Sequence, residues 1–207
     1  MRYRLVVWDF DGTLADTFSL ALSTYNRLAA RHGCMPVQDP ETIRRLPTRE
    51  FLRQHRVSLV RLPLLIRDYL AEQRKWVDQV RLAPGVADTT ARLRSAGVRL
   101  GILSSNTKDT ILACLTANGL ADTFEFVVGY PRLLGKARAM RRILRQQAVA
   151  PSEFLYVGDE VRDLEAAREA GVDVAAALWG FQSPEILERE RPTHLLRQPT
   201  DLLGLVL

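Results

Sequence analysis

Residues Leu5-Val6-Val7-Trp8-Asp9-Phe10-Asp11-Gly12-Thr13 join an apolar run to two carboxylates and a glycine. Four consecutive apolar residues predict a short buried strand, and Gly12 lets the chain turn sharply after it. Because side chains in a strand alternate with period two, we expect Asp9 and Asp11 to point the same way. Two such carboxylates repel each other unless a positive charge lies between them. A metal ion is one candidate for that charge.

Further apolar runs repeat this scheme along the chain, and each is separated from the next by a helical pattern. With the first run at 3–9, they predict strands at 98–103, 125–128, 154–157 and 172–177. Short strands alternating with helices imply right-handed crossovers and a parallel sheet that is covered on both faces. The predicted fold class is therefore α/β, a doubly wound parallel sheet in a three-layer α/β/α arrangement.

The segment 16–83 interrupts the alternation, because it has helical periodicity and no convincing strand. Helices are predicted at 17–31, 41–55 and 62–80, with prolines near their breaks. We call this segment the helical insert. The predicted division of the chain is a core domain of residues 1–15 and 84–207 and a helical domain of residues 16–83.

Composition restricts the classes of protein to which this chain can belong. It has 207 residues, 47% of them hydrophobic, and a formal net charge of +5 without any basic run of the kind that grips nucleic acid. The two cysteines, Cys34 and Cys114, do not form a Cys-x-x-Cys pair. No apolar stretch is long enough for a signal peptide or a membrane span. We therefore expect a cytoplasmic protein that binds neither nucleic acid nor membranes.

Four polar segments are expected to meet in space. Three of them directly follow predicted strands, and the carboxyl ends of parallel strands share one edge of the sheet, where ligands bind. Lys136 opens a predicted helix and can join them from its N-terminal end. The segments are residues 9–14, Ser104-Ser105-Asn106, Lys136 and Gly158-Asp159-Glu160-Val161-Arg162-Asp163.

These segments, in this order, resemble the motifs of the haloacid dehalogenase superfamily of aspartate-nucleophile hydrolases. Residues 9–14 match its first motif, Ser104 its second, Lys136 its third, and Gly158-Asp159-x-x-x-Asp163 its fourth. The resemblance runs from about residue 5 to about residue 180. The helical insert is similar to the small helical cap of this superfamily, and the chain looks most like its phosphoglycolate phosphatase-like members.

The resemblance implies a phosphatase mechanism with an aspartyl-phosphate intermediate. Asp9 would attack phosphorus, which divides one difficult displacement into two easier ones. Asp11 would protonate the leaving alcohol and later take a proton from water. Ser104 and Lys136 complete the implied catalytic set, because a hydroxyl and an ammonium group stabilise the charge on phosphoryl oxygens.

The same resemblance implies a Mg²⁺ site and a phosphate site. Mg²⁺ prefers octahedral oxygen coordination, which one Asp9 oxygen, the Asp11 main-chain carbonyl, Asp159 and substrate phosphate would suit, with Asp163 as an outer ligand. The implied phosphate-binding residues are Ser104, Ser105, Asn106 and Lys136. The implied partner is a small phosphorylated metabolite.

Several alternatives stay open at this point. A phosphomutase would use the same phospho-aspartate and transfer the phosphoryl group to a sugar hydroxyl, and a non-catalytic phosphate-binding or partner-interaction module would retain the site without turnover. Arg44, Arg45 and Arg49 either form a solvated basic face or contact an anionic substrate. Glu160 and Arg162 are expected to form an ion pair at a helix start. A monomer and a homodimer are both compatible with the chain.

Overall fold

Six parallel strands form the main sheet in the described part of the chain. The computed structural model describes residues 2–130 and 135–207. Within them the strand order is β5-β4-β1-β6-β7-β8, and every neighbouring pair is parallel. The strands are β1 (Leu5–Trp8), β4 (Arg99–Ser104), β5 (Phe126–Gly129), β6 (Phe154–Gly158), β7 (Asp173–Ala177) and β8 (His194–Leu196).

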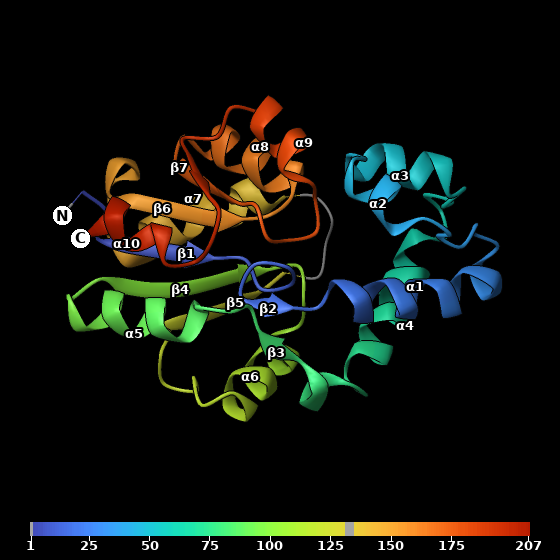
Figure 1. Cartoon of the computed structure of the whole chain (residues 1–207), viewed down its shortest axis with the longest axis horizontal. Helices are drawn as coiled ribbons and strands as arrows, with labels where there is room; N and C mark the ends of the chain where they lie inside the picture. The colour runs from blue at the N-terminus through green and yellow to red at the C-terminus, as the bar shows by residue number, and fades with distance from the viewer. Residues whose placement is uncertain (1, 131–134) are drawn as a thin grey trace.

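Helices cover both faces of this sheet (Figure 1), which confirms the predicted three-layer α/β/α arrangement. Val6 and Trp8 of β1 face one apolar core, and Leu5 and Val7 face the other. A strand with core on both faces is apolar at every position, which explains the run that opens the chain. The first core is completed by α5 (Val86–Ser95), α6 (Lys108–Ala117) and α10 (Asp201–Val206), the second by α7 (Lys136–Gln147), α8 (Val161–Ala170) and α9 (Pro184–Arg189).

The helical insert lies beyond the carboxyl ends of the strands and has a small apolar cluster of its own (Figure 1). Its helices are α1 (Phe18–His32), α2 (Pro40–Arg44), α3 (Thr48–Gln54) and α4 (Leu62–Gln73), followed by a 3₁₀ turn, η1 (Val77–Gln79). A two-residue antiparallel ladder joins β2 (Ala15–Asp16) to β3 (Arg81–Leu82), near the points where the chain is expected to leave and rejoin the core. The division at residues 15/16 and 83/84 stays a prediction.

Two helix predictions in the insert are wrong in their bounds. The single helix expected at 41–55 is two helices, α2 and α3, because Pro47 has an extended ψ of 150° and serves as the N-cap of α3. The helix expected at 62–80 ends at Gln73. The short strands β2, β3 and β8 were not predicted, since two or three residues are too few to show a period. No helix in the described residues is long and apolar enough to cross a membrane.

The packing of α6 predicts a large difference between two neighbouring residues. Ile111 is fully buried in the first core, whereas Leu112 is 36% exposed. Ile111→Ala is expected to lower the free energy of unfolding by about 2–5 kcal/mol, because it removes buried methyl groups and leaves a cavity. Leu112→Ala is the matched control and is expected to lower it by less than about 1 kcal/mol. Urea unfolding checks both, and equal losses would contradict this packing.

Candidate functional site

The turn after β1 brings the first carboxylate into the site. The strand ends at Trp8, and the Phe10 carbonyl then accepts hydrogen bonds from the amides of residues 13, 14 and 15 at 3.3, 3.0 and 2.9 Å. Gly12 has a φ of 77°, and a Cβ atom there would lie 2.2 Å from Oδ2 of Asp159. Only glycine combines this backbone conformation with so close an approach.

Residues from four distant parts of the sequence meet at this edge of the sheet. Asp9 follows β1, Ser104 ends β4, Lys136 opens α7, and Asp159 and Asp163 lie after β6 and in the first turn of α8. All five are buried. The structure therefore brings together the residues that the four sequence segments contribute.

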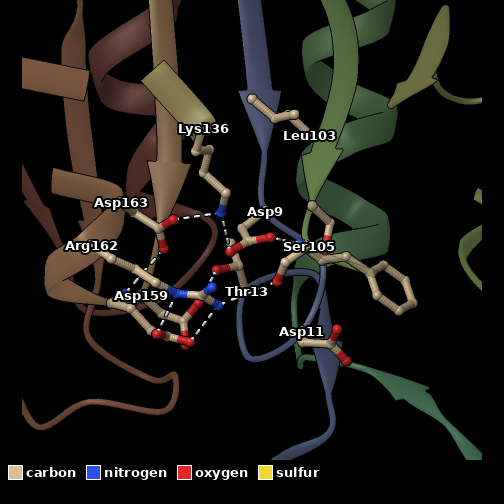
Figure 2. Close-up of polar contacts among 12 residues, drawn as sticks. Asp9, Asp11, Thr13, Leu103, Ser105, Lys136, Asp159, Arg162 and Asp163 are labelled. Atoms are coloured by element: carbon tan, nitrogen blue, oxygen red, sulfur yellow. Dashed lines mark hydrogen bonds and ion pairs between the residues drawn. The ribbon is translucent and has the colours of Figure 1, made fainter. Parts of the chain in front are cut away.

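Lys136 lies between two of the carboxylates (Figure 2). Its Nζ is 2.8 Å from Oδ2 of Asp9 and 2.5 Å from Oδ1 of Asp163. Burial lowers the pKa of Lys136, but the charges of Asp163 and Asp9 outweigh it, so the pKa is raised and the ammonium stays charged. The ring of Tyr156 lies 5.2 Å from Nζ and adds a cation–π contact.

Asp159 is a buried carboxylate held by neutral donors. Its Oδ1 accepts a hydrogen bond from Thr13 Oγ1 at 2.5 Å, and its Oδ2 accepts one from the Phe181 amide at 2.7 Å. Burial, together with the negative charges of Glu160, Asp9 and Asp163, raises the pKa of Asp159 well above its usual range. Among the described residues no cationic side chain pairs with this carboxylate, so a bound metal ion would compensate its charge.

The acidic cluster fits a hard divalent cation. One carboxylate oxygen each from Asp9, Asp159 and Asp163 lies within 4.8 Å of the other two. All three donors are oxygen, the ligand type that Mg²⁺ and Ca²⁺ prefer. Lys136 compensates only one of the three negative charges, so a bound dication would neutralise the cluster.

Asp11 faces a different environment from Asp9 (Figure 2), which corrects the expectation that the two side chains point the same way. The period of two does not extend to both of them, because β1 ends at Trp8 and the chain turns between Asp9 and Asp11. The Asp11 carboxylate accepts hydrogen bonds from Thr17 Oγ1 at 3.0 Å, Gln73 Nε2 at 3.4 Å and Asn106 Nδ2 at 2.9 Å. Burial, with the charge of Asp9, raises its pKa to about 6.

The segment after β4 contributes hydroxyl and amide groups. Ser104 Oγ accepts a hydrogen bond from the Asn106 amide at 3.2 Å, and Ser105 Oγ accepts one from Arg162 Nη2 at 3.4 Å. The Asn106 side chain bridges Asp11 and the amide of Thr107. Thr107 is the N-cap of α6, so Asn106 is free of that structural role.

The three candidate arginines of the insert, Arg44, Arg45 and Arg49, do not line the pockets at the site. Arg44 Nη2 donates to the Gly180 carbonyl at 2.8 Å, and its guanidinium carbon lies 4.9 Å from the centre of the Phe18 ring. Arg45 and Arg49 are exposed. Arg44 therefore joins the insert to the loop after β7, and the solvated alternative fits the other two.

Three contacts at the site involve groups to which the sequence assigned no role. Thr13 lies inside the first motif, so its position signalled a function, but its contact with Asp159 depends on the fold. Gln73 reaches Asp11 from the end of α4, and nothing in the local sequence of that helix singles it out. The Phe181 contact uses a main-chain amide, for which residue type carries no signal.

Comparison with known proteins finds a matching family model and several similar proteins. Residues 6–177 match the family model of the haloacid dehalogenase-like hydrolases. A phosphoglycolate phosphatase of Synechococcus elongatus is 35% identical over 203 residues, covering 97% of this chain and 96% of that protein. The pyrophosphatase PpaX of Listeria innocua is 25% identical, with 97% and 95% covered. A solved haloacid dehalogenase-like hydrolase of Streptococcus pneumoniae shares the fold, with a TM-score of 0.80 at 23% identity and 98% of each chain covered.

The charge imbalance predicts that Asp159→Asn stabilises the metal-free protein, because the amide removes a buried charge without a cationic partner. The raised pKa gives the sign of the pH dependence. The folded state holds this proton more tightly than the unfolded state, so the free energy of unfolding of the wild type falls as pH rises above about 4. The stabilisation that Asp159→Asn gives therefore increases with pH.

Thermal unfolding in a chelator at pH 4 to 7 measures this difference in melting temperature. Asp163→Asn is the comparison: burial raises the pKa of Asp163 to about 6 although its carboxylate pairs with Lys136, so a smaller stabilisation is expected than for Asp159→Asn. A melting temperature that Asp159→Asn lowers across the whole pH range would contradict the proposed imbalance.

Proposed function

The chain belongs to the haloacid dehalogenase-like hydrolases, and from that premise we propose that it is a Mg²⁺-dependent phosphatase of the cytoplasm. It hydrolyses a small phosphate monoester through an aspartyl-phosphate on Asp9. The observation that carries the proposal is the buried pairing of Asp9 with Lys136 beside two further carboxylates. A purely structural core would not retain three buried acids and one ammonium, because burying charge is unfavourable.

Asp9 is the proposed nucleophile. Its Oδ1 accepts a hydrogen bond from the Phe10 amide at 2.7 Å and its Oδ2 one from Lys136, so the carboxylate is fixed before substrate arrives. The attack forms a bond between an Asp9 oxygen and phosphorus and breaks the bond from phosphorus to the leaving oxygen. Lys136 stabilises the negative charge of the transferred group, and the Ser104 hydroxyl donates to another phosphoryl oxygen.

Asp11 is the proposed general acid and base. Its side chain lies apart from the acidic cluster and is oriented by Thr17, Gln73 and Asn106. From there its proton passes to the leaving oxygen in the first half-reaction, and its carboxylate takes a proton from water in the second. Ser105 and Asn106 complete the proposed phosphate-binding set.

Asp9, Asp159 and the Asp11 main-chain carbonyl would hold Mg²⁺, with Asp163 as an outer ligand. When bound, the ion supplies positive charge to the phosphoryl group and reduces its repulsion with the nucleophile. Thr13 positions Asp159, because its hydroxyl donates to Oδ1 of that carboxylate while the Phe181 amide donates to Oδ2.

Removal of the nucleophile is the central test. Asp9→Asn is expected to lower kcat on phosphate monoesters by at least about 10³-fold, because an amide oxygen is a poor nucleophile. Asp16→Asn, an exposed residue of the same segment, is the control and is expected to retain wild-type activity. Release of inorganic phosphate is the readout, with circular dichroism to check folding. Full activity of purified Asp9→Asn would reject the proposal.

Metal removal is a second test. Dialysis against a chelator is expected to lower phosphate release at least about 100-fold, and added Mg²⁺ is expected to restore it, because the cluster is left with excess negative charge. Undiminished turnover in the chelator would refute the metal requirement.

The products from a hexose phosphate separate the alternatives: inorganic phosphate indicates a phosphatase, whereas an isomeric sugar phosphate indicates a phosphomutase.

A further inference from the structure

Two adjoining pockets lie between the helical insert and the site. The inner pocket, of about 150 Å³, is lined by Asp11, Ser105 and Asn106 of the core and by side chains of α4. The outer pocket, of about 280 Å³, is lined mainly by α1, α2 and α3. Tyr69, Glu160, Arg162 and Phe181 line both pockets. The two pockets are therefore neighbours that share part of their walls.

The outer pocket is apolar over most of its wall. The insert contributes aromatic and aliphatic side chains to it, among them Phe18, Leu22, Tyr25, Ile43 and Phe51. Such walls favour an apolar ligand, because burial of apolar surface is favourable. An apolar cavity of about 150 Å³ is known to admit benzene, so the outer pocket has room for a six-membered ring.

Among the described residues, the walls of the two pockets carry no uncompensated positive charge. Arg162 is the one cationic side chain among the described residues that line either pocket. Its Nε and Nη2 donate to the two carboxylate oxygens of Glu160 at 2.6 and 2.9 Å, and both side chains are largely buried. Glu160 in turn accepts a hydrogen bond from Thr48 of α3 at 3.4 Å. The pair is therefore neutral as a whole and fixed in place.

A second anionic group on the substrate would be poorly accommodated here. A buried carboxylate or phosphate needs a cationic partner, and without one its desolvation is uncompensated. It would also lie near the carboxylates of Asp11 and Glu160. Phosphoglycolate carries a carboxylate and pyrophosphate a second phosphate, so both substrate types named for the relatives are disfavoured by these walls.

We propose, on the basis of the proposed function, that the substrate is a phosphate monoester of an uncharged, ring-sized apolar alcohol. Its phosphate lies at Asp9 and Lys136, its leaving oxygen at Asp11, and its apolar body extends through the inner pocket into the outer one. The Glu160–Arg162 pair acts as a specificity determinant, because Glu160 neutralises the Arg162 guanidinium, with which a second anionic group could otherwise pair.

Three substrates with primary alkyl leaving groups test the proposal with matched chemistry: benzyl phosphate, ethyl phosphate and phosphoglycolate, each with Mg²⁺. The kcat/KM for benzyl phosphate is expected to exceed those for the other two by at least about tenfold. A kcat/KM for phosphoglycolate equal to or above that for benzyl phosphate overturns the substrate class while the phosphatase function stands. Hydrolysis of none of the three overturns both.

Two variants locate the preference in the pockets. Leu22→Ala is expected to lower the ratio of kcat/KM for benzyl phosphate to that for ethyl phosphate by about tenfold, because it removes apolar contacts that only the ring reaches. Leu64→Ala, an exposed leucine of α4 outside both pockets, is the matched control and leaves both values unchanged. An unchanged ratio in folded Leu22→Ala overturns the assignment of the ring to the outer pocket.

Glu160→Gln keeps the size of the side chain and leaves the charge of Arg162 uncompensated. It is expected to raise kcat/KM for phosphoglycolate relative to benzyl phosphate by about tenfold, because Arg162 then becomes a partner for the carboxylate. A melting curve checks folding. A ratio that Glu160→Gln leaves unchanged or lowers overturns the role of the ion pair in specificity.

Discussion

The buried contact of Lys136 with Asp9 and Asp163 is the interaction on which the site depends. It joins the first residue of α7 to the residue after β1 and to the first turn of α8, so it fixes three separate connections relative to one another. A buried ammonium is tolerated only with such partners. The close approach of Gly12 to Asp159 serves the same end, because it lets the turn after β1 and the segment after β6 lie together without steric overlap.

The separation of Asp11 from this cluster divides the site into two parts. The carboxylates of Asp9, Asp159 and Asp163 gather on the side of α7 and α8, whereas Asp11 is oriented from the helical insert by Thr17 and Gln73. The position of the insert therefore bears on Asp11 more than on Asp9. The contacts of Arg44 with Gly180 and of Gln182 with the Leu46 carbonyl, at 2.8 and 2.7 Å, fix that position from the core side.

The relatives and the pockets inform different parts of the proposed function. The shared family and fold bear on the edge of the sheet, because the match to the family model spans residues 6–177 and so includes Asp9, Lys136 and Asp159. The pockets are built largely from the insert, and their walls are a property of this chain. A fold can carry one chemistry to different substrates, because side chains outside the reacting centre decide which leaving group is desolvated favourably.

The sequence alone determined the sheet and the meeting of Asp9, Ser104, Lys136, Asp159 and Asp163, because apolar runs identify parallel strands and the carboxyl ends of such strands share one edge. Only the tertiary structure decided the direction of Asp11, the contacts of Thr13 and Gln73, and the exposure of the Glu160–Arg162 pair to both pockets. Each of these depends on the packing of segments far apart in the chain. A local pattern records which face of an element is apolar, but not which distant backbone or side chain will lie against it.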